Sequence, residues 1–259
     1  QPEEFTVPDD VLAAWRKAGE RGTAVHAEWR KRLEKSGKKD EFGARMAGQV
    51  DDSWLKPYVD KLLSDLKPVA TRKPSEMALE AINVAIAGTI GGSADLTGSN
   101  NTKTKSTEPL TADNYAGRYV YYGIREFGMA AAMNGMALHG GVIPYGGTFL
   151  VFTDYARPAI RLSALQGAKV IYVMTHDSIG LGEDGPTHQP IEHLQSLRAM
   201  PQIDVYRPAD AVETAECWAL PLAVTGQSVL ALTRQNLNPV RTQASDENLC
   251  AKGAYRLKP

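Results

Sequence analysis

The stretch Val170-Ile-Tyr-Val-Met174, followed by the loop Thr175-His-Asp-Ser-Ile-Gly-Leu-Gly-Glu-Asp-Gly-Pro-Thr-His-Gln-Pro190, indicates both the fold and the place of the site. The first segment is an apolar run of strand length, as found in strands that a parallel sheet buries on both faces. The second segment carries two histidines, three acidic residues and three glycines within 16 residues. Loops that follow a buried strand carry the chemistry of α/β proteins, because the sheet holds the strand end rigidly. We therefore expect the functional site in the loop 175–190.

The sequence around this loop alternates between helical and strand patterns. Strands are expected near 89–94 and at 118–124, 142–149, 169–175, 203–206 and 229–233. Helices are expected from a capping Ser75 onward and at 126–139, 154–166, 191–200 and 211–223. Alternation with short connections predicts an α/β domain in which a parallel sheet is flanked by helices.

The first 70 residues have a different character. Val25, Trp29 and Leu33 recur at fourfold spacing among basic residues, which predicts helices with one narrow apolar face. The basic run 30–39 is interpreted as a solvated helix face and His26 as part of the same section. We expect a helical connector at 1–70, an α/β domain at 71–240, and a linker at 241–259 that leads towards a missing C-terminal domain.

The bulk composition limits the function classes. The 259 residues include 29 basic and 30 acidic ones, which argues against a nucleic-acid or anionic-membrane partner. No apolar run approaches the roughly 20 residues that span a bilayer, so a cytoplasmic protein is expected. Cys217 and Cys250 are too few for a disulfide framework, and Cys217 fits a buried helical thiol. The chain begins at Gln1 without an initiator methionine, which suggests a piece of a longer protein.

Two other readings of the loop 175–190 are weaker. Gly180-Leu-Gly-Glu-Asp-Gly185 matches the dinucleotide fingerprint, but Glu183 and Asp184 would repel a pyrophosphate, and Pro186 delays the helix that should follow. A metal centre would use His176, Asp177, Asp184 and His188, yet no paired spacing fixes a ligand geometry. Hydrogen bonding to a polyhydroxylated substrate uses the same groups without a metal. His139 and His193 fall within helical patterns and are assigned to structure.

Four further segments accompany the loop: Gly91-Gly-Ser-Ala-Asp-Leu-Thr-Gly-Ser99, Tyr121-Tyr-Gly-Ile-Arg-Glu-Phe-Gly-Met129, Tyr145-Gly-Gly-Thr-Phe-Leu-Val-Phe152 and Thr233-Arg-Gln-Asn236. Together, the five segments resemble transketolase, specifically its middle domain, which binds the aminopyrimidine of thiamine diphosphate. The resemblance runs from about Arg72 to Asn236 and keeps the family's order. It implies transfer of a two-carbon ketol unit from a ketose phosphate to an aldose phosphate, in the pentose phosphate pathway or the Calvin cycle.

The resemblance assigns functional roles to residues whose sequence context alone indicates an ordinary structural role. A glutamate in the first turn of a helix, such as Glu126, usually complements the helix dipole. In the family, the matching glutamate instead hydrogen-bonds N1′ of the aminopyrimidine and helps to activate the cofactor. The matching positions also place Phe149, Phe152 and Tyr155 around the pyrimidine ring and Asp95 near the thiazolium ring and the dimer contact. Core packing for the aromatics and turn formation for Asp95 are the simpler readings.

The sugar-binding positions follow from the same resemblance. The residues matching His176, Asp184 and His188 contact the ketose hydroxyls, and the histidines handle protons. Those matching Arg72, Ser99 and Arg234 hold the sugar phosphate, for which a guanidinium offers a planar fork of donors.

One part of the family's site is absent from this sequence. The family binds the diphosphate and its Mg²⁺ (or Ca²⁺) through a Gly-Asp-Gly motif in another domain, and no Gly-Asp-Gly occurs here. The resemblance therefore implies no metal site on this chain, a homodimeric parent and an isolated chain without activity. The alternatives are a dihydroxyacetone synthase, a 1-deoxyxylulose-5-phosphate synthase, or a non-catalytic assembly subunit. Arg125-Glu-Phe-Gly-Met129 favours transketolase over the second of these.

Overall fold

The computed structural model describes residues 3–256, in two units that divide between Ala44 and Arg45. The first unit contains α1 (Asp9–Glu20), α2 (Thr23–Lys35) and the start of α3 (Lys39–Met46). None of these helices has a buried side chain. Trp29 stacks on His26 and meets the edge of Phe42, which are the aromatic contacts of this unit. The predicted helical character is confirmed, and α3 is an additional helix after the break at Ser36.

The second unit is built on a six-stranded parallel sheet. Its strands are β1 (Thr89–Ser93), β2 (Tyr119–Tyr121), β3 (Ile143–Phe149), β4 (Ile171–Thr175), β5 (Ile203–Tyr206) and β6 (Gln227–Leu232). Their order is β2-β1-β3-β4-β6-β5, and every neighbouring pair is parallel. All residues of β3, β4 and β6 are buried, which explains why β4 appears in the sequence as a continuous apolar run.

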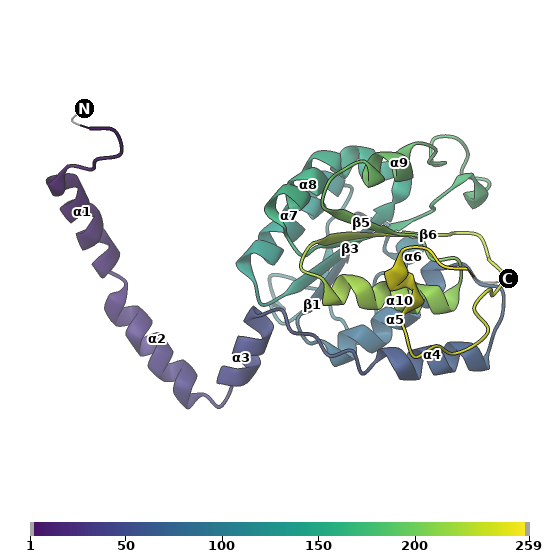
Figure 1. Ribbon diagram of the computed structural model, residues 1–259, viewed down its shortest axis with the longest axis horizontal. Coiled ribbons are helices and arrows are strands. Elements are labelled where there is room, and N and C mark those ends of the chain that lie inside the picture. The colour runs from purple at the N-terminus through teal and green to yellow at the C-terminus, as the bar shows by residue number, and fades with distance from the viewer. Residues whose placement is uncertain (1–2, 257–259) are drawn as a thin grey trace. The chain divides into compact units, whose positions relative to one another are not determined.

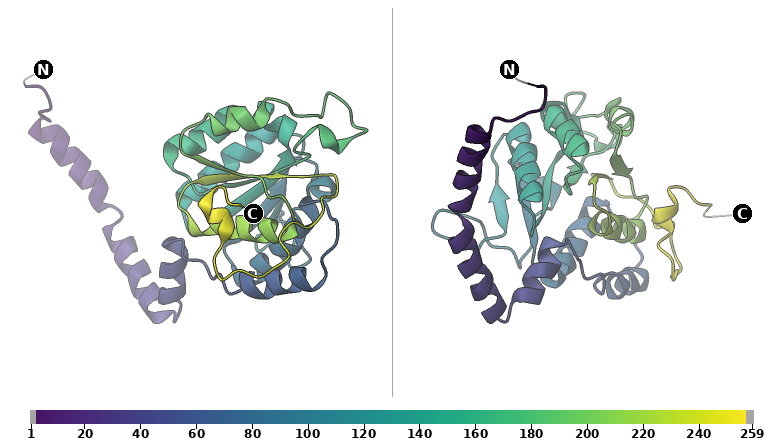
Figure 2. Two further views of the ribbon diagram at one scale, coloured as in Figure 1. Left: turned by 45° about the vertical axis from the view of Figure 1, so that its right-hand side comes forward. Right: turned by 60° about the vertical axis from the view of Figure 1, so that its left-hand side comes forward.

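Helices cover both faces of the sheet, as the sequence predicts. One layer consists of α4 (Leu55–Ser64), α5 (Arg72–Ala85) and α10 (Ala211–Ala223), and the other of α7 (Glu126–His139), α8 (Thr153–Gln166) and α9 (His193–Arg198) (Figures 1 and 2). Shorter elements are α6 (Thr97–Asn100), η1 (Leu150–Phe152), η2 (Ile179–Leu181) and η3 (Leu249–Lys252). None of the helices among residues 3–256 is long and apolar enough to cross a membrane.

Each helix layer has its own apolar core against the sheet. On the α5–α10 side, the fully buried Trp218 meets Tyr145 of β3 edge-on, with 6.0 Å between ring centroids. The indole Nε1 of Trp218 donates a hydrogen bond to Ser75 Oγ at 2.8 Å. On the other side, Met129 and Met133 of α7 pack with Ile160 of α8. Truncating a buried tryptophan to alanine costs about 3–5 kcal/mol, so these clusters hold the sheet edge in place.

Several element boundaries differ from the sequence prediction. Ser75 does not cap α5, because the helix begins at Arg72 and the buried Ser75 hydroxyl instead accepts the bond from Trp218. The second strand covers 119–121 rather than 118–124, since Gly123 has a φ of 68° and turns the chain out of the sheet. Helix α9 covers only 193–198 of the predicted 191–200. The buried position of Cys217 in α10 is confirmed.

Candidate functional site

The topology brings the predicted site segments to one edge of the sheet. In register, Phe149 pairs with Thr175 and Thr175 pairs with Leu232, so β3, β4 and β6 end side by side. The chain leaves these ends at η1, at His176 and at Thr233. Because carboxyl ends of parallel strands meet at one edge, the turn after β1 and the start of α7 after β2 lie at the same edge.

His176 lies at the centre of this edge. It adopts a left-handed backbone conformation, with φ of 59°, and its side chain is 3% exposed. Its ring stacks on Phe149 with 3.6 Å between centroids, and its Nδ1 lies 2.9 Å from Thr175 Oγ1. The strand end, the aromatic ring and the threonine together fix the orientation of the imidazole.

The surroundings of His176 keep its ring uncharged at neutral pH. Burial is the main cause that lowers the pKa of His176 to about 4, and the positive charge of Arg72 adds to it. Asp184 acts in the opposite direction, while Arg234 and His188 lower the pKa further. A neutral imidazole can donate one hydrogen bond and accept another, which suits contacts to hydroxyl groups.

An aromatic cluster extends from His176 along η1 into α8. The rings of Phe149 and Phe152 are nearly parallel, with 5.7 Å between centroids and 9° between planes. Tyr155 lies 6.0 Å beyond Phe152, and the His188 ring meets Phe152 edge-on at 5.4 Å. Phe149 is buried, whereas Tyr155 is exposed, so the cluster presents aromatic surface at its open end.

Two guanidinium groups lie near each other at the same edge. Burial is the main cause that lowers the pKa of Arg72, and the charge of Arg234 lowers it further, while Asp184 raises it. Arg72 Nη1 donates to the backbone oxygen of Ser99 at 2.9 Å, and Arg234 pairs with Glu183. Two neighbouring cations, both partly buried, form a site suited to an anion such as a phosphate.

Glu126 begins α7 and is 8% exposed. Among residues 3–256 its carboxylate forms no hydrogen bond or ion pair, and the neighbouring Phe127 is half-exposed. The nearby Tyr122 hydroxyl is also buried without a partner within that range. The Glu126 oxygens are not among the fully buried, unpartnered side-chain atoms of residues 3–256, so they remain accessible to a hydrogen-bond partner from a ligand. With the aromatic cluster at the same edge, these residues fit a flat, nitrogen-containing aromatic ring.

Asp95, His139 and His193 lie outside the groups described above. Asp95 lies in the turn between β1 and α6, exposed and with φ of 62°. His139 is exposed at the end of α7, and its Nδ1 lies 3.1 Å from the Gly140 oxygen. His193 is buried, with Nε2 3.1 Å from Asp154 Oδ2, which agrees with a structural histidine.

Two residues of this edge were not singled out by sequence reasoning. The buried Asn100 donates from Nδ2 to Thr175 Oγ1 at 2.7 Å. Arg207 donates from Nε to Asp177 Oδ2 at 2.7 Å, and the Asp177 side chain is fully buried. Their partners are 75 and 30 residues away in sequence, so no local pattern could have identified them.

The weaker sequence readings do not find support in the structure. No helix begins directly after Gly185, because α9 starts only at His193, and the dinucleotide-binding interpretation is therefore rejected. Among residues 3–256, one group of at least three side chains gathers potential metal ligands within 4.8 Å of each other: Asp154, Glu192 and His193. None of these is a predicted site residue, and Asp177 is already paired with Arg207.

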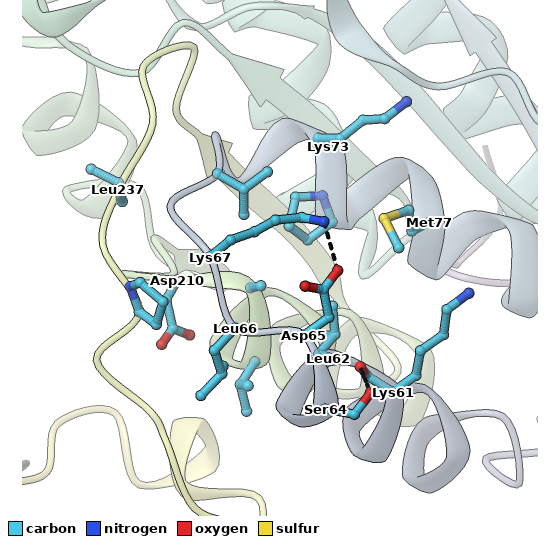
Figure 3. Close-up of a pocket in the computed structure, with 15 residues that line it drawn as sticks. Lys61, Leu62, Ser64, Asp65, Leu66, Lys67, Lys73, Met77, Asp210 and Leu237 are labelled. Atoms are coloured by element: carbon cyan, nitrogen blue, oxygen red, sulfur yellow. Dashed lines mark hydrogen bonds and ion pairs between the residues drawn. The ribbon is translucent and has the colours of Figure 1, made fainter.

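An apolar cavity of about 360 Å³ lies elsewhere in the second unit (Figure 3). It lies between the end of α4, the start of α5 and the segment around Leu237, with an Asp65–Lys67 ion pair at its side. None of the predicted site residues lines it. The chemistry at the sheet edge is therefore separate from this cavity.

Comparisons with known proteins agree with these observations. A family model described as the transketolase pyrimidine-binding domain matches residues 67–240. A transketolase from Cereibacter sphaeroides is 55% identical over 259 residues, which cover 98% of this chain and 39% of that protein. The structure of a transketolase from Pichia stipitis in complex with sedoheptulose 7-phosphate is 42% identical, with a TM-score of 0.83 over 92% of this chain and 37% of that one. The present chain thus spans about two fifths of the length of its curated relatives.

A more distant solved structure also matches this chain. It is described as a split-gene transketolase, an inactive β4 tetramer. It is 27% identical, with a TM-score of 0.55 over 67% of this chain and 54% of that one.

Proposed function

Because this chain belongs to the transketolase family, we propose that it forms one wall of a site that transfers a two-carbon ketol unit from a ketose phosphate to an aldose phosphate. The observation that carries the proposal is a convergence at one sheet edge. A mostly buried glutamate without a partner among the described residues, a cluster of aromatic rings and two neighbouring guanidinium groups lie at this edge: Glu126, Phe149, and Arg72 with Arg234. Each group suits a different part of the cofactor–substrate pair.

Phe149, Phe152 and Tyr155 are the residues that would hold the aminopyrimidine of thiamine diphosphate, with Asp95 close to the thiazolium ring. Stacking contributes roughly 0.5–1.5 kcal/mol per aromatic pair beyond area burial. Glu126 would share a proton with the ring nitrogen N1′, which gives its unpaired carboxyl the missing partner. When bound, the cofactor supplies the nucleophilic carbon that breaks and forms the C–C bonds.

The sugar end of the site uses the other residues. Arg72, Ser99 and Arg234 would bind the terminal phosphate of substrates such as xylulose 5-phosphate and ribose 5-phosphate. His176, Asp184 and His188 would contact the sugar hydroxyls and handle protons. The neutral ring of His176 supports this role, because it offers both a donor and an acceptor nitrogen.

This wall needs a second one to complete the site. We place the diphosphate and its Mg²⁺ or Ca²⁺ on a separate diphosphate-binding domain, and expect the isolated chain to be inactive. A homodimeric assembly is supported by the outer side of α7, where Phe127 and Leu138, with Ile124 just before the helix, are large apolar side chains that are half or more exposed. A cytoplasmic location and a role in the pentose phosphate pathway or the Calvin cycle complete the proposal.

The proposal is tested by Glu126→Gln in the chain assembled with a diphosphate-binding domain, thiamine diphosphate and Mg²⁺. The variant keeps the shape of the side chain but removes its acid–base function. We expect ketol transfer to fall at least about 100-fold, as for other acid–base groups, with an unchanged melting temperature. Glu108→Gln, at an exposed position, is the matched control and should keep full activity. Wild-type turnover by Glu126→Gln would rule out the assigned role.

A further inference from the structure

A continuous chain of hydrogen bonds runs behind His176, on the side of Nδ1. Ser93 Oγ donates to Asn100 Oδ1 at 2.9 Å, and Asn100 Nδ2 donates to Thr175 Oγ1 at 2.7 Å. Thr175 Oγ1 in turn lies 2.9 Å from His176 Nδ1. Ser93, Asn100 and Thr175 are fully buried, so water does not compete for these bonds.

From this arrangement we propose that Asn100 and Thr175 are positioning residues that fix the tautomer of His176, with Nδ1 as the acceptor and Nε2 carrying the proton. The reason is a count of protons. A threonine hydroxyl has one proton to donate, and among residues 3–256 its oxygen has two partners: the Asn100 amide, which can only donate to it, and His176 Nδ1, which is therefore the one acceptor for that proton. Its proton therefore goes to Nδ1, and a neutral imidazole then holds its single N–H at Nε2.

The charge state of His176 agrees with this count. Burial and the charges of Arg72 and Arg234 lower the pKa of His176 to about 4 against the opposing effect of Asp184, so the ring is neutral near pH 7. A doubly protonated ring would donate from Nδ1 to Thr175 Oγ1, and the buried Thr175 hydroxyl proton would then have no acceptor among residues 3–256. Under the proposed function, Nε2–H is then a fixed donor for an oxygen of the sugar.

The backbone around the chain of bonds leaves little freedom. A Cβ on Gly147 would lie 3.1 Å from Asn100 Cβ and 2.8 Å from Thr102 Cγ2, so only glycine leaves room for Asn100 in this position. His176 is held by its stacking on Phe149 and by its left-handed φ. Asp177, the next residue, is anchored by Arg207. The ring cannot turn over without disturbing several of these contacts.

The same short helix also reaches the phosphate end of the site. Ser99, adjacent to Asn100 in α6, accepts a hydrogen bond from Arg72 Nη1 through its backbone oxygen. Helix α6 therefore contacts the anion-binding arginine with one residue and the chain of bonds to His176 with the next. This links the position of the sugar phosphate to the orientation of the imidazole.

The test is a long-range ¹H–¹⁵N NMR spectrum of the imidazoles in the 259-residue chain at pH 7, with the His176 signals assigned by their loss in His176→Asn. We expect the Nε2–H pattern in the wild type and in Thr175→Ser, which keeps the hydroxyl. Thr175→Val removes only the hydroxyl, and its His176 should show a mixture of tautomers. The Nδ1–H pattern in the wild type, or an unchanged pattern in Thr175→Val, would overturn the proposal.

A second variant keeps the proposal testable if Thr175→Val does not fold. In Asn100→Asp a carboxylate replaces the amide donor, so the Thr175 hydroxyl donates its proton to that carboxylate. Thr175 Oγ1 can then only accept a hydrogen bond from His176, which requires a proton on Nδ1. Persistence of Nε2–H alone in Asn100→Asp would contradict the proposal. These spectra need neither cofactor nor substrate, so they can fail or succeed independently of the proposed function on which the role of Nε2–H rests.

The assembled enzyme supplies a further readout. If the fixed donor acts on the reacting sugar, Thr175→Val should lower kcat by about 10-fold or more and change KM by a smaller factor. Thr175→Ser, which keeps the hydroxyl, should have the kcat of the wild type. A purely structural role would instead lower the melting temperature of both variants and leave kcat per folded molecule unchanged.

Discussion

His176 combines two demands that usually conflict, since a polar ring is buried and yet kept available for a ligand. The structure resolves this by burying the ring in its neutral form. The histidine itself could be predicted from the loop sequence, but its pKa could not. That value depends first on burial and then on the charges of Arg72 and Arg234, which lie far away along the chain and approach only after folding.

The low pKa of His176 predicts a measurable dependence of stability on pH. Between about pH 6.5, where an unfolded histidine takes up a proton, and pH 4, only the unfolded state is protonated at this site. The free energy of unfolding should therefore fall as the pH is lowered through this window, by on the order of 3 kcal/mol for this group alone. Urea unfolding of the wild type and of His176→Asn at several pH values measures the difference.

The exposed His26 provides the control for this experiment. His26→Asn should retain the wild-type pH dependence, whereas His176→Asn should show a flatter curve between pH 6.5 and 4. Parallel curves for the wild type and His176→Asn would show that the buried ring is protonated in the folded state.

A second prediction at the residue scale concerns Glu183, whose carboxylate forms an ion pair with the Arg234 guanidinium. A substrate phosphate must displace this carboxylate to reach the guanidinium. Because Glu183 is largely exposed, the ion pair contributes no more than about 1 kcal/mol. In the assembled enzyme, Glu183→Gln should lower KM for sugar phosphates, by up to about fivefold, with little change in kcat.

The direction of that change is informative. Asp184, the next residue, is assigned to the sugar hydroxyls, so Asp184→Asn should raise KM under the same conditions. A raised KM in Glu183→Gln as well would mean that Glu183 assists phosphate binding, contrary to the present account.

At the scale of elements, the strands were the easiest to predict from sequence. β3, β4 and β6 are buried on both faces, and their composition reflects this directly. The lengths of β2 and α9 were predicted too long, because the ends of these elements are determined by the turn at Gly123 and by contacts between elements. The position of Ser75 shows the same limit, since its partner Trp218 lies 143 residues away.

The packing of the chain after β6 depends on α10. Arg241 forms two hydrogen bonds with the carboxylate of Glu216 at 2.9 and 3.0 Å, and both side chains are about 6% exposed. Removing one partner of a buried pair leaves an uncompensated charge, at a cost of about 3–5 kcal/mol. We expect Arg241→Met to lower the free energy of unfolding by this amount in urea titrations. The control is Arg161→Met at an exposed position of α8, which should stay within about 0.5 kcal/mol of the wild type.

An equally small effect of both substitutions would contradict the role given to the Arg241–Glu216 pair. It would mean that the segment after β6 contributes little to the stability of the second unit. No sequence pattern indicated this pair, because its members lie 25 residues apart and in different elements.

At the scale of the whole molecule, the two units differ in how their helices are supported. Within the first unit α1 and α2 bury no side chains, and Trp15 and Val25 are exposed. Isolated helices of this length are marginal in water. Limited trypsin digestion followed by mass spectrometry should therefore cleave first within residues 16–38 and leave a resistant fragment that begins near Arg45. Initial cleavage within the sheet-containing unit would contradict this prediction.

The domain bounds of 71–240 remain a prediction, and two other starting points for this domain can be compared with residue 71. The contacts divide the chain after Ala44, whereas the family model begins at residue 67. The difference arises at α4, whose Tyr58 and Leu62 pack into the core with α10. The sequence analysis placed this helix within the 1–70 connector, since an amphipathic pattern does not reveal which surface the helix covers.

The central claim is that this chain supplies one of two walls of a ketol-transfer site. Its most direct test is an assay of transfer from xylulose 5-phosphate to ribose 5-phosphate with thiamine diphosphate and Mg²⁺. The chain would be assayed alone, and then mixed with a separately produced diphosphate-binding domain. We expect neither part to turn over alone and the mixture to release glyceraldehyde 3-phosphate. A mixture that associates, as shown by sedimentation, and yet produces no turnover would contradict the account.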